Sequence, residues 1–137
     1  MQKWLPSSEL ASELIDVRDT GLIGRGLFLT TNVRAGICLG KFESIEIDAQ
    51  ESASIEKMSL GAYVWEHKSK SGWLLLPFGW INFINHSRRP NCVARWTEKS
   101  SGWQVELYCL SDIAEDAQLF IDYGCDDSEL GFAPRGA

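Results

Sequence analysis

Short runs of alternating apolar and polar residues make up most of this chain. Runs rich in β-branched and aromatic residues, each bounded by turn signals, predict strands at residues 14–18, 37–42, 45–47, 62–65, 73–76, 92–96, 103–110 and 119–124. Hydrophilic residues 68–72 and 97–102 predict the turns of two hairpins. Residues 48–60 have helical composition, with Asp48 as candidate N-cap and Gly61 as candidate C-cap. We therefore predict a mostly-β fold with short helices.

Composition supports one domain. The chain has 137 residues, of which 45% are hydrophobic, with 6 Trp and 6 Phe. That is enough apolar material for one hydrophobic core without disulfide or metal staples. We predict a single domain over residues 1–137, with a loose lead-in or a short helix at residues 1–13 and a small, acidic tail at residues 125–137.

The net charge and the cysteines limit which binding partners and which cellular compartment we expect. The net charge of −6 disfavours direct nucleic acid binding, which needs a basic face. It suits a basic peptide, although acidity also serves solubility. The four cysteines lack the spacing of a zinc site, so we predict no metal. The N-terminus lacks the apolar run of a signal peptide, and no stretch is long enough to span a membrane. We predict an intracellular protein with reduced thiols.

A dense polar run, Asn85-His86-Ser87-Arg88-Arg89-Pro90-Asn91, lies within apolar flanks. Polar side chains in such surroundings cost free energy unless hydrogen bonds satisfy them. Two interpretations stand: the run lines a site, or it forms a turn whose side chains cap their own backbone.

A second candidate segment is Gly24-Arg25-Gly26, preceded by Gly21. Glycines permit positive φ or close approach of the backbone to another group. The order of the three glycines is the reverse of the dinucleotide fingerprint, and no helical pattern follows, which argues against a Rossmann site. Taken alone, the segment indicates only a tight turn.

Three segments in order change this picture: Gly24-Arg25-Gly26-Leu27-Phe28, Asn85-His86-Ser87 followed by Pro90-Asn91, and Leu119 followed by Asp122-Tyr123-Gly124. Together they resemble the motifs of the SET-domain protein lysine methyltransferases, and the match runs over about residues 14–124. The resemblance implies small curved β-sheets whose C-terminal segment threads under a loop to form a pseudoknot. That crossing would bring residues 85–91 beside residues 122–123.

The resemblance implies the cofactor S-adenosyl-L-methionine. The backbone of Gly24, Arg25 and Gly26 would hold its methionine end, with the glycines admitting close approach. Asn85 would lie near the amino-acid portion of the cofactor, and His86 would contact the adenine chiefly through its backbone. His86 is open to another interpretation, that of a satisfied core histidine.

The resemblance also implies a catalytic tyrosine, Tyr123, whose hydroxyl would face the transferring methyl group and the substrate amine. By position rather than motif, Tyr63 and Tyr108 are candidates for the lysine channel, although both could be sheet or core residues. Ile121 stands where several relatives carry an aromatic residue that influences how many methyl groups are added. An aliphatic residue there leaves mono-, di- and trimethylation open.

Methyl transfer from a sulfonium to an amine needs alignment of nitrogen, carbon and sulfur, and it needs a neutral lysine. Free lysine has a pKa of about 10.4. An apolar channel and a neighbouring sulfonium both disfavour the ammonium form, so no dedicated general base is required. Tyr123 is expected to orient the amine rather than to remove its proton, because an unperturbed phenol is protonated at neutral pH.

The chain departs from the family pattern in several places. Arg88 stands where many members have Cys, and Asp116-Ala117-Gln118-Leu119 stands where they have G-E-E-L. No cysteine cluster flanks the domain, so the chain resembles the minimal viral and bacterial members without zinc-binding pre-SET or post-SET segments. Leu130 and Phe132 of the tail are candidates to cover the cofactor, by analogy only.

The resulting prediction is a protein-lysine N-methyltransferase acting on a basic, lysine-containing segment, with histone tails favoured, in the cytoplasm or in the nucleus and chromatin of a host cell. A homodimer would protect exposed sheet edges. The alternatives are an inactive SET-fold module that binds cofactor or a basic peptide, and a structural β-domain without a ligand.

Overall fold

The computed structural model describes residues 14–124. These residues form strands, one α-helix and two 3-10 helices in the order β1 (Ile15–Asp19), β2 (Arg25–Leu29), β3 (Cys38–Ile47), α2 (Ala49–Ile55), η1 (Ser59–Ala62), β4 (Trp65–Glu66), β5 (Leu74–Pro77), η2 (Trp80–Phe83), β6 (Asn85–His86), β7 (Cys92–Lys99), β8 (Gly102–Cys109) and β9 (Gln118–Ile121). The mostly-β prediction is confirmed.

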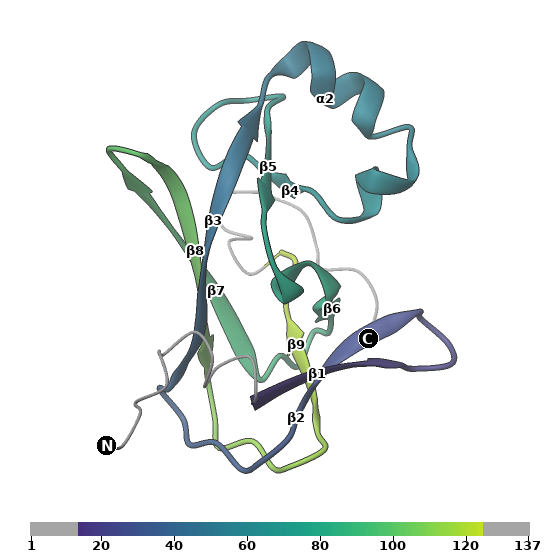
Figure 1. The fold of residues 1–137 in the computed structure, drawn as a ribbon, viewed down its shortest axis with the longest axis vertical. Coiled ribbons are helices and arrows are strands. Elements are labelled where there is room, and N and C mark those ends of the chain that lie inside the picture. The colour runs from purple at the N-terminus through teal and green to yellow at the C-terminus, as the bar shows by residue number, and fades with distance from the viewer. Residues whose placement is uncertain (1–13, 125–137) are drawn as a thin grey trace, which may run out of the picture.

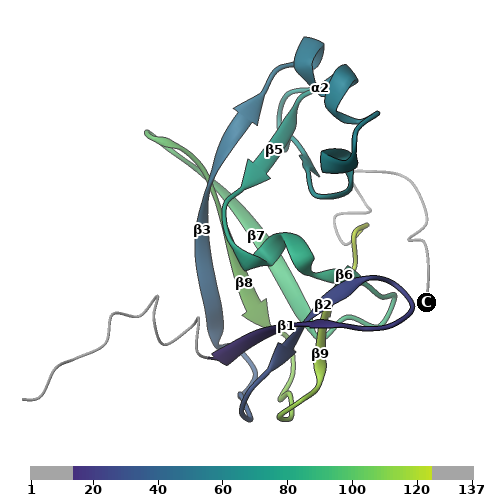
Figure 2. The same ribbon diagram turned by 45° about the vertical axis from the view of Figure 1, so that its right-hand side comes forward.

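The strands form two sheets. One has the order β4-β5-β3-β8-β7, and the other has the order β1-β2-β9-β6. In Figure 1 the five-stranded sheet runs along the long axis, with α2 at its upper end, and the hairpin of β1 and β2 lies at the opposite end. Figure 2 shows the curvature of β3 and β8 and the smaller sheet packed across their lower part.

The last described strand lies inside the smaller sheet rather than at its edge. On one side β9 pairs antiparallel with β2, with Leu27 opposite Leu119. On the other side it pairs parallel with β6, with Asn85 opposite Phe120 and His86 opposite Ile121. The C-terminal segment is thereby joined to the polar run, as the family resemblance predicts.

Asn91 holds this crossing with both ends of its side chain. Its Nδ2 donates to the carbonyl oxygen of Gln118 at 2.9 Å, and its Oδ1 accepts from the backbone N–H of Phe120 at 2.8 Å. The N–H of Ser87 donates to the carbonyl oxygen of Ile121 at 3.0 Å. The Asn91 side chain thus caps backbone groups of another segment, which explains why this polar residue is tolerated near apolar flanks.

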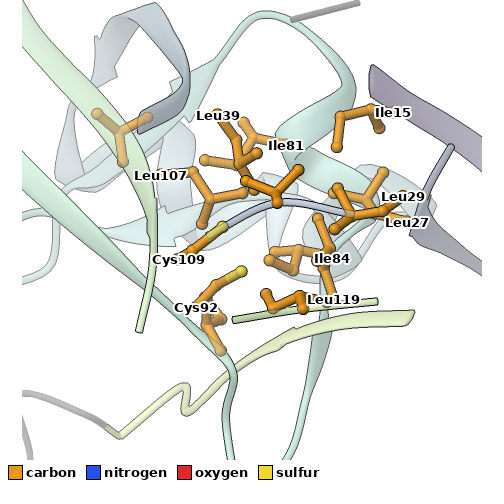
Figure 3. Packing of buried hydrophobic residues seen from close by; sticks show 14 of the residues in the cluster. Ile15, Leu27, Leu29, Leu39, Ile81, Ile84, Cys92, Leu107, Cys109 and Leu119 are labelled. Carbon is orange, nitrogen blue, oxygen red and sulfur yellow. The ribbon is translucent and has the colours of Figure 1, made fainter. Parts of the chain in front are cut away.

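The core lies where the two sheets meet (Figure 3). Leu27, Leu29 and Leu119 of the smaller sheet and Leu39 and Leu107 of the larger sheet are all 0% exposed. Burying one such side chain stabilises the fold by about 2 kcal/mol. The core also contains Cys92 and Cys109, directly opposite each other on β7 and β8, and both are free thiols.

The predicted helix at residues 48–60 is partly correct. Asp48 is its N-cap, and its Oδ1 accepts from the backbone N–H of Glu51 at 2.9 Å. However, α2 ends at Ile55, and the role assigned to Gly61 as C-cap is wrong, since Gly61 lies within η1. A Cβ at Gly61 would approach the carbonyl oxygen of Ile55 to 2.9 Å. The lack of a side chain at Gly61 therefore allows η1 to pack against the end of α2.

Several strand boundaries also differ. The strands predicted at residues 37–42 and 45–47 are one continuous strand, β3, while the strand predicted at 62–65 begins only at Trp65. The second hairpin is longer than predicted, because β7 and β8 pair as far as Lys99 and Gly102. Residues 1–13 and 125–137, which include Leu130 and Phe132, lie outside the described residues. Within residues 14–124, no helix combines the length and the apolar character needed to cross a membrane.

Candidate active site

Tyr123 follows β9 and is held by two hydrogen bonds, one to the polar run and one to the residue that precedes it. Its backbone N–H donates to Nδ1 of His86 at 2.9 Å, and its hydroxyl donates to the carbonyl oxygen of Ile84 at 2.8 Å. The rings of His86 and Tyr123 lie 5.1 Å apart between centroids. The residue remains 51% exposed. Tyr123 is therefore fixed in direction yet reachable by a ligand.

The pKa of Tyr123 supports its role as a neutral phenol. Burial of the hydroxyl raises this pKa above its ordinary value of 10.0. The group is then protonated at neutral pH, and its hydrogen is used by the carbonyl oxygen of Ile84. What remains on the hydroxyl oxygen is acceptor capacity. Tyr123 can therefore accept a hydrogen bond from an amine, but it is not suited to remove a proton.

His86 has a fixed tautomer and one unused donor. Because Nδ1 accepts from the N–H of Tyr123, the proton of the neutral ring is on Nε2. Nε2 is buried and has no hydrogen-bond partner among residues 14–124. The Asp122 carboxylate lies 3.7 Å from Nδ1, which is too far for a hydrogen bond. Among the described residues, His86 is thus a histidine with one hydrogen-bonding group left unsatisfied.

Asn85 connects the first motif to the second. Its Nδ2 donates to the carbonyl oxygen of Arg25 at 3.0 Å and to Oε1 of Gln118 at 2.9 Å. In the sequence, Gln118 is recognisable only as a departure from the family pattern. Its contact with Asn85 is not predicted. The missing signal is spatial, because the contact depends on β9 lying between β2 and β6.

Glycine is required at positions 24 and 26 of the first motif for two different structural reasons. Gly24 has φ of +81°, so it is needed for the backbone turn, and no atom of residues 14–124 lies within 4 Å of its would-be Cβ. Its carbonyl oxygen accepts from the N–H of Thr20 at 2.7 Å, which closes the turn. At Gly26, a Cβ would overlap Oε1 of Gln118 and would lie 2.9 Å from Nδ2 of Asn85. Gly26 therefore makes room for these two side chains.

Arg25 and Tyr63 both contact the ring of Phe83, which lies just before the polar run. The Arg25 guanidinium lies 4.5 Å from the centroid of the Phe83 ring. The Tyr63 ring meets Phe83 edge to face at 5.8 Å between centroids. Tyr63 is 37% exposed, so part of the residue is accessible to solvent. The structure thus brings Tyr63 near the segment that precedes the polar run.

Tyr108 is not brought to this cluster. It lies on β8 between Leu107 and Cys109, which are buried in the core, and alternate residues of a strand point to opposite faces. The Arg95 guanidinium lies 5.4 Å from the centroid of its ring. Tyr108 is therefore on the outer face of the larger sheet.

Ile121 lies on β9 directly opposite His86, and its side chain is 2% exposed within the core. It supports the crossing from the core side and presents almost no surface to a ligand. Residues 14–124 contain no group of three or more His, Cys, Asp or Glu placed to hold a metal ion.

Two curved β-sheets, with a C-terminal strand inserted beside an Asn-His-Ser segment and a tyrosine just beyond it, define the class of this protein. The chain belongs to the SET domain family, whose sequence model matches residues 24–124.

Two relatives are informative. The chain is 26% identical over 113 residues to a histone-lysine N-methyltransferase of Schizosaccharomyces pombe specific for H3 lysine 37, covering 80% of this chain and 73% of that protein. It is 39% identical over 57 residues to a histone-lysine N-methyltransferase of Chaetomium globosum specific for H3 lysine 4. That match covers 42% of this chain and only 5% of the Chaetomium protein.

Solved structures agree on the fold. A crystal structure from Plasmodium falciparum superposes with a TM-score of 0.64 at 21% identity, covering 82% of this chain and 95% of that chain. A humanized mutant of the Chaetomium thermophilum Polycomb Repressive Complex 2 gives a TM-score of 0.67 at 18% identity, covering 80% of this chain and 15% of that chain.

Proposed function

We propose that this chain is an S-adenosyl-L-methionine-dependent protein-lysine N-methyltransferase. The observation that carries the proposal is the link between His86 and Tyr123 across the crossing. It fixes Tyr123 next to His86, while the neighbouring Asn85 donates to the carbonyl oxygen of Arg25 in the Gly24-Arg25-Gly26 turn.

The residues present fit the cofactor that SET methyltransferases use. His86 offers a buried Nε2–H without a partner among the described residues, and such a donor is costly unless a ligand satisfies it. Beside Gly24 the described residues leave space for close approach to the backbone. Asn85 has its two amide hydrogens engaged, so its oxygen is the group left to accept from a ligand ammonium. When bound, the cofactor supplies an electrophilic methyl group on a positively charged sulfur.

Tyr123 has the central part in the mechanism. Its oxygen accepts a hydrogen bond from the substrate amine and orients the nitrogen lone pair for in-line attack, which is where positioning contributes most. It does so as a neutral phenol, since its pKa is raised by burial. The substrate lysine must enter uncharged, and desolvation beside a positive charge lowers its pKa without a protein base.

The substrate class follows from charge and from the named relatives. An acidic chain with net charge −6 attracts a basic segment, and the relatives are specific for lysines of histone H3. We therefore propose a histone tail, or another basic protein segment, as substrate, which would place the activity in the nucleus or on chromatin. The alternative is a module that binds cofactor or basic peptide without catalysis.

The decisive experiment is methyl transfer from labelled S-adenosyl-L-methionine to core histones and to a cell lysate. Wild type is compared with Tyr123→Phe and with the matched control Tyr108→Phe, which changes a tyrosine on the outer sheet face. We expect Tyr123→Phe to lower kcat about a hundredfold or more, because an oriented polar group at the reacting centre is lost. Tyr108→Phe should retain activity.

Each outcome has a clear meaning. Label in lysine that Tyr123→Phe abolishes supports the enzyme and identifies its substrate. Cofactor binding by calorimetry without any transfer favours the catalytically inactive module. Absence of cofactor binding would contradict the proposed function and leave only the fold.

A further inference from the structure

We propose that Gln118 is a positioning residue of the cofactor site, and that its side chain sets the direction in which Asn85 presents its amide oxygen. The inference rests on the proposed cofactor binding at Gly24, Gly26 and Asn85. Gln118 stands where the family pattern carries an acidic residue, so its role here depends on hydrogen bonding rather than on charge.

This proposal follows from a count of the hydrogen-bond donors and acceptors of the Asn85 side-chain amide. Nδ2 lies 3.0 Å from the carbonyl oxygen of Arg25 and 2.9 Å from Oε1 of Gln118. The Arg25 carbonyl can only accept, so the group that faces it must be the NH₂ group of Asn85. The same NH₂ group then requires an oxygen, rather than a nitrogen, from Gln118. Both hydrogens are used, and the only capacity left on the amide is the acceptor Oδ1.

The main chain of Gln118 is held independently of this contact. It pairs with Phe28 of β2, and its carbonyl oxygen accepts from Nδ2 of Asn91 at 2.9 Å. The next residue, Leu119, points into the core and is 0% exposed. Gln118 therefore points to the opposite face of β9, where the absence of a side chain at Gly26 leaves it space.

The consequence concerns preorganisation of the site. An asparagine amide that turns over by 180° replaces its oxygen with an NH₂ group, which would repel a ligand ammonium. Two acceptors on the NH₂ group oppose that rotation before the ligand arrives, so less free energy is spent on ordering the side chain during binding. Loss of Gln118 removes one of the two restraints. The effect should fall on cofactor affinity and leave the chemical step unchanged.

The test is calorimetric titration of the full chain with S-adenosyl-L-methionine. Gln118→Leu should raise the Kd about tenfold, since one hydrogen bond of the site is lost. Gln118→Glu keeps an oxygen acceptor and should stay within about threefold of wild type. The matched control is Gln104→Leu, because Gln104 on β8 donates to Glu43 away from the site.

A double-mutant cycle separates positioning from a general structural effect. Asn85→Ala weakens binding by itself, and adding Gln118→Leu should change the Kd no further, because Gln118 acts through Asn85. In methyl transfer, Gln118→Leu should raise the KM for the cofactor and keep kcat within about twofold, since the reacting atoms are not touched.

The inference is overturned if wild type binds the cofactor and Gln118→Leu binds equally well, or if Gln118→Leu still weakens binding in the Asn85→Ala background. If wild type itself does not bind, the proposed function fails, and the inference with it. Thermal melting checks that each variant is folded. Should Gln118→Leu lack a melting transition, Gln118→Met, which keeps the side-chain length, replaces it in the cycle.

Discussion

The two histidines of this chain lie in different regions, and in both of them Nδ1 accepts hydrogen bonds from the backbone. His67, beyond β4 in the larger sheet, accepts at Nδ1 from the backbone N–H groups of Ser69 and Lys70, both at 3.0 Å. His86, in the crossing, accepts at Nδ1 from the N–H of Tyr123 at 2.9 Å. In both rings the neutral tautomer therefore carries its proton on Nε2.

The two regions differ in the hydrogen-bond partner that they offer to Nε2 of the histidine. Nε2 of His67 lies 2.6 Å from the Glu46 carboxylate, and the ring contacts Trp73 and Trp103 at 6.0 and 5.4 Å between centroids. Nε2 of His86 is buried without a partner in the described part of the chain. A histidine with every valence satisfied holds a turn in place. A histidine with an unused buried donor indicates a site that a ligand completes.

The largest effect is expected at His86. His86→Leu removes the acceptor for Tyr123 and the unused donor, so we expect methyl transfer to fall about a hundredfold or more and cofactor binding to weaken. His86→Asn, whose side-chain oxygen can replace Nδ1, should recover part of the activity. Rates and cofactor Kd are measured for both variants, and equal rates for wild type and His86→Leu would refute the assigned role.

A smaller but still large effect is expected at Asn91, whose side chain holds the same crossing. Asn91→Leu leaves the carbonyl oxygen of Gln118 and the N–H of Phe120 without their partner. The free energy of unfolding should fall by about 3 kcal/mol, at about 1–3 kcal/mol for each unsatisfied group. Urea denaturation measures it, and a loss under about 1 kcal/mol would mean that other groups hold β9.

At His67 the expected loss is one of stability alone. His67→Leu removes the partner of Glu46 and of the turn, so the free energy of unfolding should fall by about 2 kcal/mol. The folded variant should bind cofactor like wild type, since its contacts lie in the larger sheet. Calorimetry on this variant sharpens the comparison, because an altered cofactor Kd would show that the two regions are coupled.

The smallest effect concerns acid stability. The hydrogen bond from His67 is the largest of the causes that lower the pKa of Glu46 below its ordinary value of 4.5. A carboxylate with a lowered folded-state pKa adds stability above its unfolded value, and that stability is lost as the pH falls through the folded value. Glu46→Gln should therefore melt only slightly below wild type at neutral pH, and its Tm should fall less steeply below about pH 4.5. Parallel acid dependences would exclude Glu46 as a contributor.

The sequence predicts two strands of the smaller sheet, β1 and β9, but it does not predict β2 or β6 as strands. The polar run, the glycine turn and Tyr123 are recognisable as motifs, and the resemblance implies the crossing that joins them. One departure from the pattern also has a local explanation. Asp116 replaces a glycine of the family pattern and has φ of 68°, a conformation that glycine adopts more readily. Its carboxylate lies 3.0 Å from the Arg18 guanidinium.

Other features could not be predicted, because they depend on register rather than on local pattern. Alternation along β8 shows that Tyr108 and Leu107 point to opposite faces, but it does not show which face meets the site. The contact between Gln118 and Asn85 exists only because β9 is inserted beside β6. Likewise, the two histidines are alike in type, and only the position of Glu46 on β3 shows which of them is fully satisfied.

The inserted position of β9 also has a consequence for biosynthesis. Because a chain is made from its N-terminus, β1 and β2 leave the ribosome long before the strand that must lie beside β2. Leu27 of β2 pairs with Leu119 of β9, which is synthesised much later. Pairing of strands so far apart in the sequence is slow compared with the closure of a hairpin. Until then the nascent chain exposes the apolar surface that Leu119 and Ile121 will cover. Completion of the candidate active site is thus a late step in folding, and chaperones would matter most in the interval before it.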